Sequence, residues 1–316
     1  MAVQAQDARG FRLAVRARTD GLVADDVDRA LTVDRSVVVS TLNRGTLHLV
    51  RAEDHGWLHA LTTPPLAAGS ARRLAQEGVP PDAAERGITA VVTALAADGP
   101  LGRTALRPRV AAAGVRVEGQ ALVHVLFAAT LRGLIVRGPV VDGEHAFVLV
   151  RDWLGSLGEP WAGDRDDALI RLAERYLAGH APAGERDLAR WSGLPLRDVR
   201  RGLQGLGPRL RESGDGLLEL GDRPPAVAAA PPRLLGAFDP LLLGWADRTW
   251  VLADHVELVT VNGIFRPFAL VDGRAAGTWA MPGGRVTLSP FEPLDAGVEA
   301  RLRVDGADIA RFLGAR

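Results

Sequence analysis

The stretch that decides the fold is EGQALVHVLFAATLRGLIVRGPVVDGEHAFVLV, residues 118–150. Its first part, Glu118–Leu131, is predicted to form a helix that ends at Gly133. Two strand-like runs follow, Leu134–Arg137 and His145–Val150, joined by a tight-turn sequence at residues 141–143. A helix that leads directly into a hairpin predicts the third helix and the wing of a winged helix.

The residues before this stretch supply the two other helices of such a unit. Asp82–Ala97 has apolar residues at helical spacing, and a Gly-Pro break follows it at residues 99–100. A shorter helix is predicted over Thr104–Ala113, ending at Gly114. Three helices followed by a hairpin is the element order of a winged helix.

The same order returns later in the chain. Asp164–Ala178 is amphipathic, Glu185–Trp191 and Leu196–Leu206 are predicted helices, and a hairpin is expected around residues 213–216. Two units in the same order, at a period of about 80 residues, indicate duplicated domains.

The two ends of the chain differ from this pattern. The N-terminal segment is interpreted as a third, less regular copy, with helices at Val23–Leu31 and Ala52–Leu61 and a strand at Thr46–Val50. Arg223–Pro232 is proline-rich and predicts a linker. The remaining predicted elements are strands at Phe265–Val271, Ala275–Ala280 and Arg285–Leu288 and closing helices at Leu294–Arg303 and Asp308–Leu313. The predicted fold class is α+β, with tandem winged-helix domains over residues 1–80 (shortened), 81–155 and 156–222 and a C-terminal β-rich domain over 233–316.

Composition narrows the chemistry. The formal net charge is zero, all 38 basic residues are arginine, and cysteine is absent. Lysine Schiff bases, disulfides and thiolate metal sites are therefore excluded, and any phosphate contact must come from arginine. No signal peptide and no apolar run long enough to span a membrane are present, so we expect a cytoplasmic protein, associated with the nucleoid if it binds DNA.

A winged helix suits double-stranded DNA, because its third helix fits the major groove while its hairpin reaches the backbone. Arginines lie at the ends of the predicted helices or in the hairpins, namely Arg132, Arg137, Arg197, Arg200 and Arg201. These are candidate DNA-binding residues. The alternative interpretation is that they are solvated faces of modules that bind another protein.

Three ordered blocks of sequence carry a family resemblance. The first is QAQD at residues 4–7, and the second is RGTLHL at residues 44–49, followed by Trp57-Leu58. The third is FDPLLLGWADR at residues 238–248, continuing into LVDGR at 270–274 and GTW at 277–279. Together they resemble the bacterial winged-helix DNA glycosylases of the AlkZ and YcaQ type, and the likeness covers nearly the whole chain.

The resemblance implies three winged helices and a β-rich part in a C shape around duplex DNA. We expect no cofactor and a monomer. It implies excision of alkylated bases and unhooking of interstrand crosslinks, with the family's catalytic glutamine pair matched by Gln4 and Gln6 around Ala5. Arg44 and His48 lie in the second block and are candidate DNA contacts; His48 is equally interpreted as a core histidine bonded to main chain. The alternative function is a DNA-binding regulator or an inactive relative.

The glutamines restrict the reaction. A glutamine is neither an acid nor a base, so it can hold a water or a sugar oxygen but needs an activated leaving group. A purine alkylated at N7 or N3 carries a positive charge and leaves as a neutral base, which meets that need. Without lysine, we expect base excision without strand cleavage. With few aromatic residues, no aromatic-lined pocket for a flipped base is apparent from the sequence.

In the resembling family a helical segment precedes the glutamine pair, whereas this chain has three residues before Gln4. We therefore expect either a start upstream of Met1 or a shortened first domain whose catalytic loop lacks packing support.

The remaining polar and aromatic residues are given structural roles. Asp7, next to the glutamines, could supply a negative charge to the site, but a surface position or a helix cap is the favoured interpretation. Asp239 is predicted to form an ion pair with Arg248. His55 and His59 are four residues apart on a predicted helix, but no third ligand is in sight, so no metal site is expected. Five tryptophans are predicted to pack in the core or between domains: Trp153, Trp191, Trp245, Trp250 and Trp279.

Overall fold

The structure is a computed structural model that describes residues 2–141, 144–222 and 230–314. The centre of the predicted turn at residues 142–143 and most of the predicted linker, residues 223–229, lie outside the described residues. None of the helices in these ranges is both long and apolar enough to cross a membrane.

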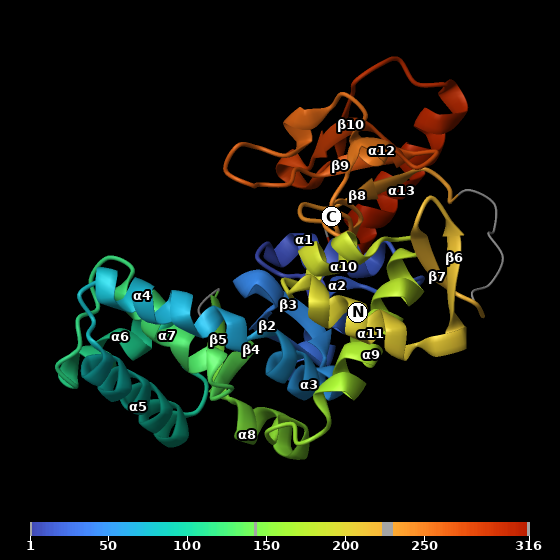
Figure 1. Ribbon diagram of the computed structural model, residues 1–316. Helices are drawn as coiled ribbons and strands as arrows, with labels where there is room; N and C mark the ends of the chain where they lie inside the picture. The colour runs from blue at the N-terminus through green and yellow to red at the C-terminus, as the bar shows by residue number, and fades with distance from the viewer. Residues whose placement is uncertain (1, 142–143, 223–229, 315–316) are drawn as a thin grey trace.

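A five-stranded antiparallel sheet lies at the centre of the molecule, in the order β1-β3-β2-β4-β5 (Figure 1). Its strands are β1 (Val3–Gln4), β2 (Val37–Leu42), β3 (Thr46–Arg51), β4 (Ile135–Val141) and β5 (Glu144–Leu149). Strand β4 pairs with β2 where Arg137 lies opposite Val39. The hairpin of the second unit therefore extends the sheet of the N-terminal segment across the predicted boundary at residue 80, and the domain limits themselves stay a prediction.

The second unit has the predicted element order. Its helices are α5 (Pro81–Asp98), α6 (Arg103–Ala112) and α7 (Ala121–Leu131), followed by β4 and β5 and the short helix α8 (Val150–Leu154). Helix α5 starts with proline at its first position and ends at Gly99, whose positive φ of +76° favours glycine. The three helices enclose an apolar core that contains Val91, Leu106 and Val125.

The third unit also follows the prediction. It comprises α9 (Arg165–His180), α10 (Glu185–Ser192), α11 (Leu196–Gly205), β6 (Leu210–Gly214) and β7 (Leu217–Leu220). Its core is continuous with that of the N-terminal segment, because Tyr176 and Trp191 belong to the same cluster as Trp57 and Leu61. The third unit thus packs directly on the segment that carries Gln4 and Gln6.

The N-terminal segment contains α1 (Ala8–Arg16), of which the sequence analysis predicted only the cap, and α4 (Ala67–Gln76), which it missed. They accompany the predicted α2 (Ala24–Thr32) and α3 (Ala52–Thr62). The Asp7 side chain caps α1 by accepting a hydrogen bond from the backbone N–H of Gly10, as predicted. The buried face of α1, with Phe11 and Leu13, packs in one cluster with Ile309 and Phe312 near the C-terminus. Its apolar partner is therefore distant in the chain.

The C-terminal part has a four-stranded sheet in the order β11-β10-β9-β8. Its elements are β8 (Arg233–Leu235), α12 (Thr249–Leu252), β9 (Phe268–Val271), β10 (Arg274–Ala280), β11 (Thr287–Pro290) and α13 (Ala296–Phe312). The prediction of two closing helices is wrong, because α13 is continuous. Gly306 lets this helix lie close to Val286, and the buried Asp305 carboxylate accepts a hydrogen bond from the backbone N–H of Leu234. Asp305 and Gly306 therefore do not end the helix; they allow α13 to pack against neighbouring segments.

Two smaller predictions are corrected. The buried Asp239 carboxylate pairs with Arg18 at 2.7 Å and not with Arg248, whose Nε donates to the backbone oxygen of Leu242. Trp250 is 43% exposed, although Trp153, Trp191 and Trp279 are buried as predicted and Trp245 is half-buried against the ring of His180. A short sequence separation did not indicate the correct ion-pair partner.

Candidate active site

The predicted catalytic glutamines lie on and just after a supported edge strand. In β1, Val3 lies opposite Leu49 and Gln4 opposite His48 on β3. The next residue continues the pairing, since the Ala5 N–H donates to the Leu47 carbonyl at 2.8 Å. The expectation of a catalytic loop without packing support is therefore wrong, because β3 and the capped start of α1 hold this segment on both sides.

The two glutamine side chains have different environments. Gln4 is 7% exposed, whereas Gln6 is exposed. Gln4 Nε2 donates to Gln6 Oε1, and the backbone N–H of Gln6 donates to Gln4 Oε1 at 3.3 Å. Gln4 thus orients Gln6. Among the residues that the structure describes, Gln6 Nε2 has no hydrogen-bond partner, and Gln6 Oε1 keeps a second lone pair beside the bond from Gln4.

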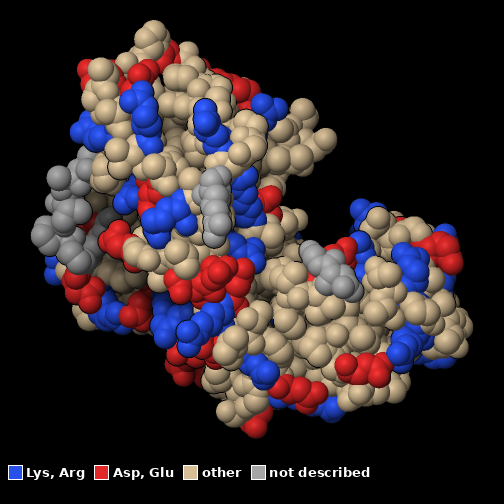
Figure 2. Space-filling model, turned by 180° about the vertical axis from the view of Figure 1, so that it is seen from behind, with Lys and Arg blue, Asp and Glu red and all other residues tan. Residues whose placement is uncertain are grey.

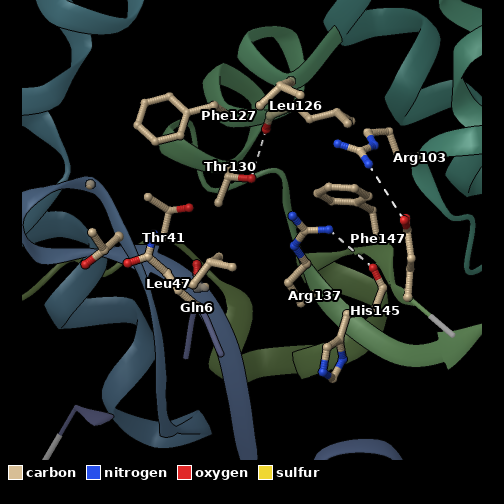
Figure 3. Close-up of a pocket in the computed structure, with 15 residues that line it drawn as sticks. Gln6, Thr41, Leu47, Arg103, Leu126, Phe127, Thr130, Arg137, His145 and Phe147 are labelled. Carbon is tan, nitrogen blue, oxygen red and sulfur yellow. Dashed lines mark hydrogen bonds and ion pairs between the residues drawn. The ribbon is translucent and has the colours of Figure 1, made fainter. Parts of the chain in front are cut away.

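Gln6 lies at a cavity of about 470 Å³ between the central sheet and α7 (Figure 3). Gln6, Thr41 and Leu47 form one side, and Arg137 and Phe147 lie across from them. The other described lining residues are Ser40, Gly45, Thr46, Arg103, Val123, Leu126, Phe127, Thr130, Glu144 and His145. Phe127 and Phe147 line this cavity from different elements, and for that reason no sign of it is visible in the sequence.

Arg137 supplies a cation to this cavity. Its Nη1 donates to the His145 carbonyl at 3.2 Å, and its guanidinium carbon lies 3.9 Å from the centre of the Phe147 ring. Burial, together with the nearby charge of Arg103, lowers the pKa of Arg137 to about 10, so it stays protonated at neutral pH. The one carboxylate among the described lining residues, Glu144, lies 3.7 Å from Arg103. The cavity therefore offers an amide and a cation beside apolar walls.

His48 is buried, with 3% of its surface exposed, and its Nδ1 donates to the backbone oxygen of Thr46 at 2.9 Å. Burial lowers the pKa of His48 to about 4, so the ring is neutral at neutral pH. Of the two interpretations from sequence, this placement is that of a core histidine bonded to main chain. Its position opposite Gln4 makes it part of the support for the glutamine pair.

The predicted DNA-binding arginines outside the cavity differ in their partners. Arg132 pairs with Glu85, Arg200 with Glu185 and Arg201 with Asp166. Arg197 is 86% exposed, with the Asp198 carboxylate 3.7 Å away. On the face that Figure 2 shows, arginine and acidic side chains are interspersed over a surface hollowed between the C-terminal part and the second unit. Contacts of these arginines with DNA stay a prediction.

The histidine pair on α3 has structural partners. His59 Nε2 donates to the Thr130 carbonyl at 2.9 Å, and His55 Nε2 lies 3.3 Å from the Ser40 hydroxyl. The neighbouring Asp54 accepts from Trp57 and pairs with Arg171. Among the residues that the structure places, no group of three histidine or acidic side chains is arranged to hold a metal ion.

The repeated helix–helix–helix–hairpin units place the chain in the class of winged-helix proteins, and the comparisons assign the reaction. The comparisons agree with this class. The model of the family described as "DNA glycosylase AlkZ-like" matches residues 1–312, and the chain belongs to that family. It is accordingly a DNA glycosylase, a hydrolase of the N-glycosidic bond.

A solved structure supports the same assignment. The DNA glycosylase AlkZ of Streptomyces sahachiroi superimposes with a TM-score of 0.79 at 26% sequence identity. The match covers 99% of this chain and 88% of that chain. A search of curated proteins gave no match.

Proposed function

We propose that this chain hydrolyses the N-glycosidic bond of purines alkylated at N7 or N3 in double-stranded DNA, with Gln6 as the catalytic residue and Gln4 as its positioning residue. The observation that carries the proposal is the exposed Gln6 amide, held at the cavity by the buried Gln4. Family membership supports the reaction class, and the chemistry of the amide supports the lesion class.

The bond changes explain why a cationic purine is needed. The C1′–N9 bond breaks with its electron pair going to the alkylated base, which leaves neutral. Water then forms the new C1′–O bond and releases a proton to solvent. The remaining lone pair of Gln6 Oε1 can accept a hydrogen bond from this water and hold it at C1′. The oxygen ends of the fixed amide dipoles add to the stabilisation of an oxocarbenium-like transition state.

The cavity also favours substituents larger than a methyl group. Its volume of about 470 Å³ lies within the usual range of ligand-binding pockets, and Phe127 and Phe147 provide apolar walls. We therefore include bulky adducts and interstrand crosslinks among the substrates. The protein is proposed to act as a monomer in the cytoplasm, on chromosomal DNA.

The first test is release of 7-methylguanine from methylated duplex DNA by the wild type and by Gln4→Ala/Gln6→Ala. We expect release by the wild type and at least about a 100-fold lower rate for the double variant, because the oriented amide is lost. The matched control is Gln204→Ala, which removes an exposed glutamine at the end of α11. Equal rates for all three proteins would contradict the assignment of the pair.

The second test concerns strand cleavage. Because the chain has no lysine, we expect the product to keep an intact abasic strand, with no protein–DNA adduct after borohydride reduction. Denaturing electrophoresis before and after alkali treatment measures both outcomes. A trapped adduct that forms with the base-releasing enzyme would show that an amine takes part.

A further inference from the structure

Three arginines with no carboxylate partner among the described residues converge beside the catalytic cavity. Arg44 lies in the turn between β2 and β3, Arg190 in α10 and Arg248 just before α12. Arg44 Nη1 donates to the Arg190 backbone oxygen at 3.0 Å. Burial, and then the charges of Arg190 and Arg248, lower the pKa of Arg44. The segment that carries Arg248 also packs on α10, because the Asp187 carboxylate accepts a hydrogen bond from the Ala246 backbone N–H at 2.8 Å. The three cations therefore lie on adjoining segments.

Several other exposed arginines are neutralised by a partner. Arg132, Arg200 and Arg209 each form a short ion pair with a glutamate. Neither Arg44 nor Arg248 has a carboxylate among the charges that shift its pKa; for Arg248 burial comes first, followed by Arg190. Like charges gathered without a counterion destabilise the folded chain unless an anion binds to them.

The backbone fixes the position of this cluster. Asn43 has a φ of +35° and is fully buried, so the turn that presents Arg44 is held in an uncommon conformation. Gly193, the left-handed residue that ends α10, allows close approach, because a side chain there would meet the Arg44 Cγ at 3.0 Å. The Nε of Arg248 donates to the Leu242 carbonyl at 2.6 Å, which leaves its terminal nitrogens available.

The cluster adjoins the reaction site. Gly45, next to Arg44, lines the cavity that holds Gln6 and also an adjoining groove of about 570 Å³ that Arg44 lines. We propose that Arg44, Arg190 and Arg248 together bind one phosphodiester group of the DNA backbone close to the damaged nucleotide. The inference rests on the proposed function. It states which part of the protein holds the DNA backbone and so fixes the position of the damaged nucleotide relative to Gln6.

Salt dependence of DNA binding tests this assignment. The logarithm of the binding constant falls with the logarithm of salt concentration by about 0.9 for each phosphate that the protein neutralises. We expect Arg190→Gln and Arg248→Gln each to reduce this slope by up to about 0.9 on an undamaged duplex followed by fluorescence anisotropy. The triple variant Arg44→Gln/Arg190→Gln/Arg248→Gln should reduce the slope by about 0.9 in total, because the three arginines share one phosphate. If each arginine bound a separate phosphate, the triple variant would reduce the slope by about three times as much.

The control is Arg86→Gln, which removes an exposed arginine paired with Asp82 on α5 and should leave the slope unchanged. An unchanged slope in the triple variant, with the wild-type unfolding curve retained, would overturn the proposal. A second result would also overturn the proposal: the wild type binds inorganic phosphate in calorimetry at constant ionic strength, while the variants keep the wild-type salt slope for DNA. The cluster would then be a site for a free anion and not for DNA. Since the duplex is undamaged, these results do not depend on base release.

Discussion

Replacing Gln6 with alanine is expected to lower the single-turnover rate of 7-methylguanine release by roughly 10²- to 10³-fold, the usual effect of removing one preorganised polar group from a reaction centre. Gln6 is the exposed member of the pair, and the hydrogen bond from Gln4 Nε2 to its Oε1 holds the amide in place. The lesion still enters the cavity in the variant, so duplex affinity should change little. The measurement is the release rate at saturating enzyme.

Gln4→Ala provides the sharper test of the two roles. If Gln4 acts through Gln6, the double variant should be no slower than Gln6→Ala alone, because residues that act as a unit are not additive. Rate losses that multiply would show that Gln4 touches the substrate independently. Gln4→Ala also leaves the Gln6 backbone N–H without its side-chain acceptor.

Arg16→Ala is expected to lower the free energy of unfolding by about 3–5 kcal/mol, the range for breaking a buried ion pair by removing one partner. The Arg16 side chain is 2% exposed and bonds to Asp305, which is 7% exposed, and to Asp308 at 2.8 Å. These contacts join α1 to α13. The variant leaves the Asp305 carboxylate buried with fewer donors, although Leu234 N–H and Arg233 still reach it.

Urea unfolding measures this effect, with Arg29→Ala as control. Arg29 lies 3.6 Å from Asp34, and its side chain is 70% exposed, so its loss should change the free energy of unfolding by less than about 1 kcal/mol. Equal losses for the two variants would contradict a special role for the buried pair. Because α1 starts directly after the glutamines, Arg16→Ala should also reduce base release.

Part of the site could be predicted from the sequence. The order of the blocks around Gln4, Gln6 and Arg44 identified the family and the candidate pair, and the absence of lysine restricted the chemistry. The cavity could not be predicted. Gln6 follows β1 at one edge of the central sheet and Phe147 lies on β5 at the opposite edge, so the two residues line one cavity only after β4 and β5 have joined the sheet. The partners of Asp239 and Arg44 likewise depend on elements distant in the chain.

The sequence by itself determined the two helix–helix–helix–hairpin units, because helical periodicity and Gly or Pro breaks are local properties of the chain. It also determined that an amide, and no lysine amine, is available for the reaction. The tertiary structure alone decided that the second hairpin extends the N-terminal sheet, that Gln4 is buried while Gln6 is exposed, and that three arginines gather beside them. These features follow from which apolar faces pack together and which strand edges pair, and such long-range choices leave no local period in the sequence.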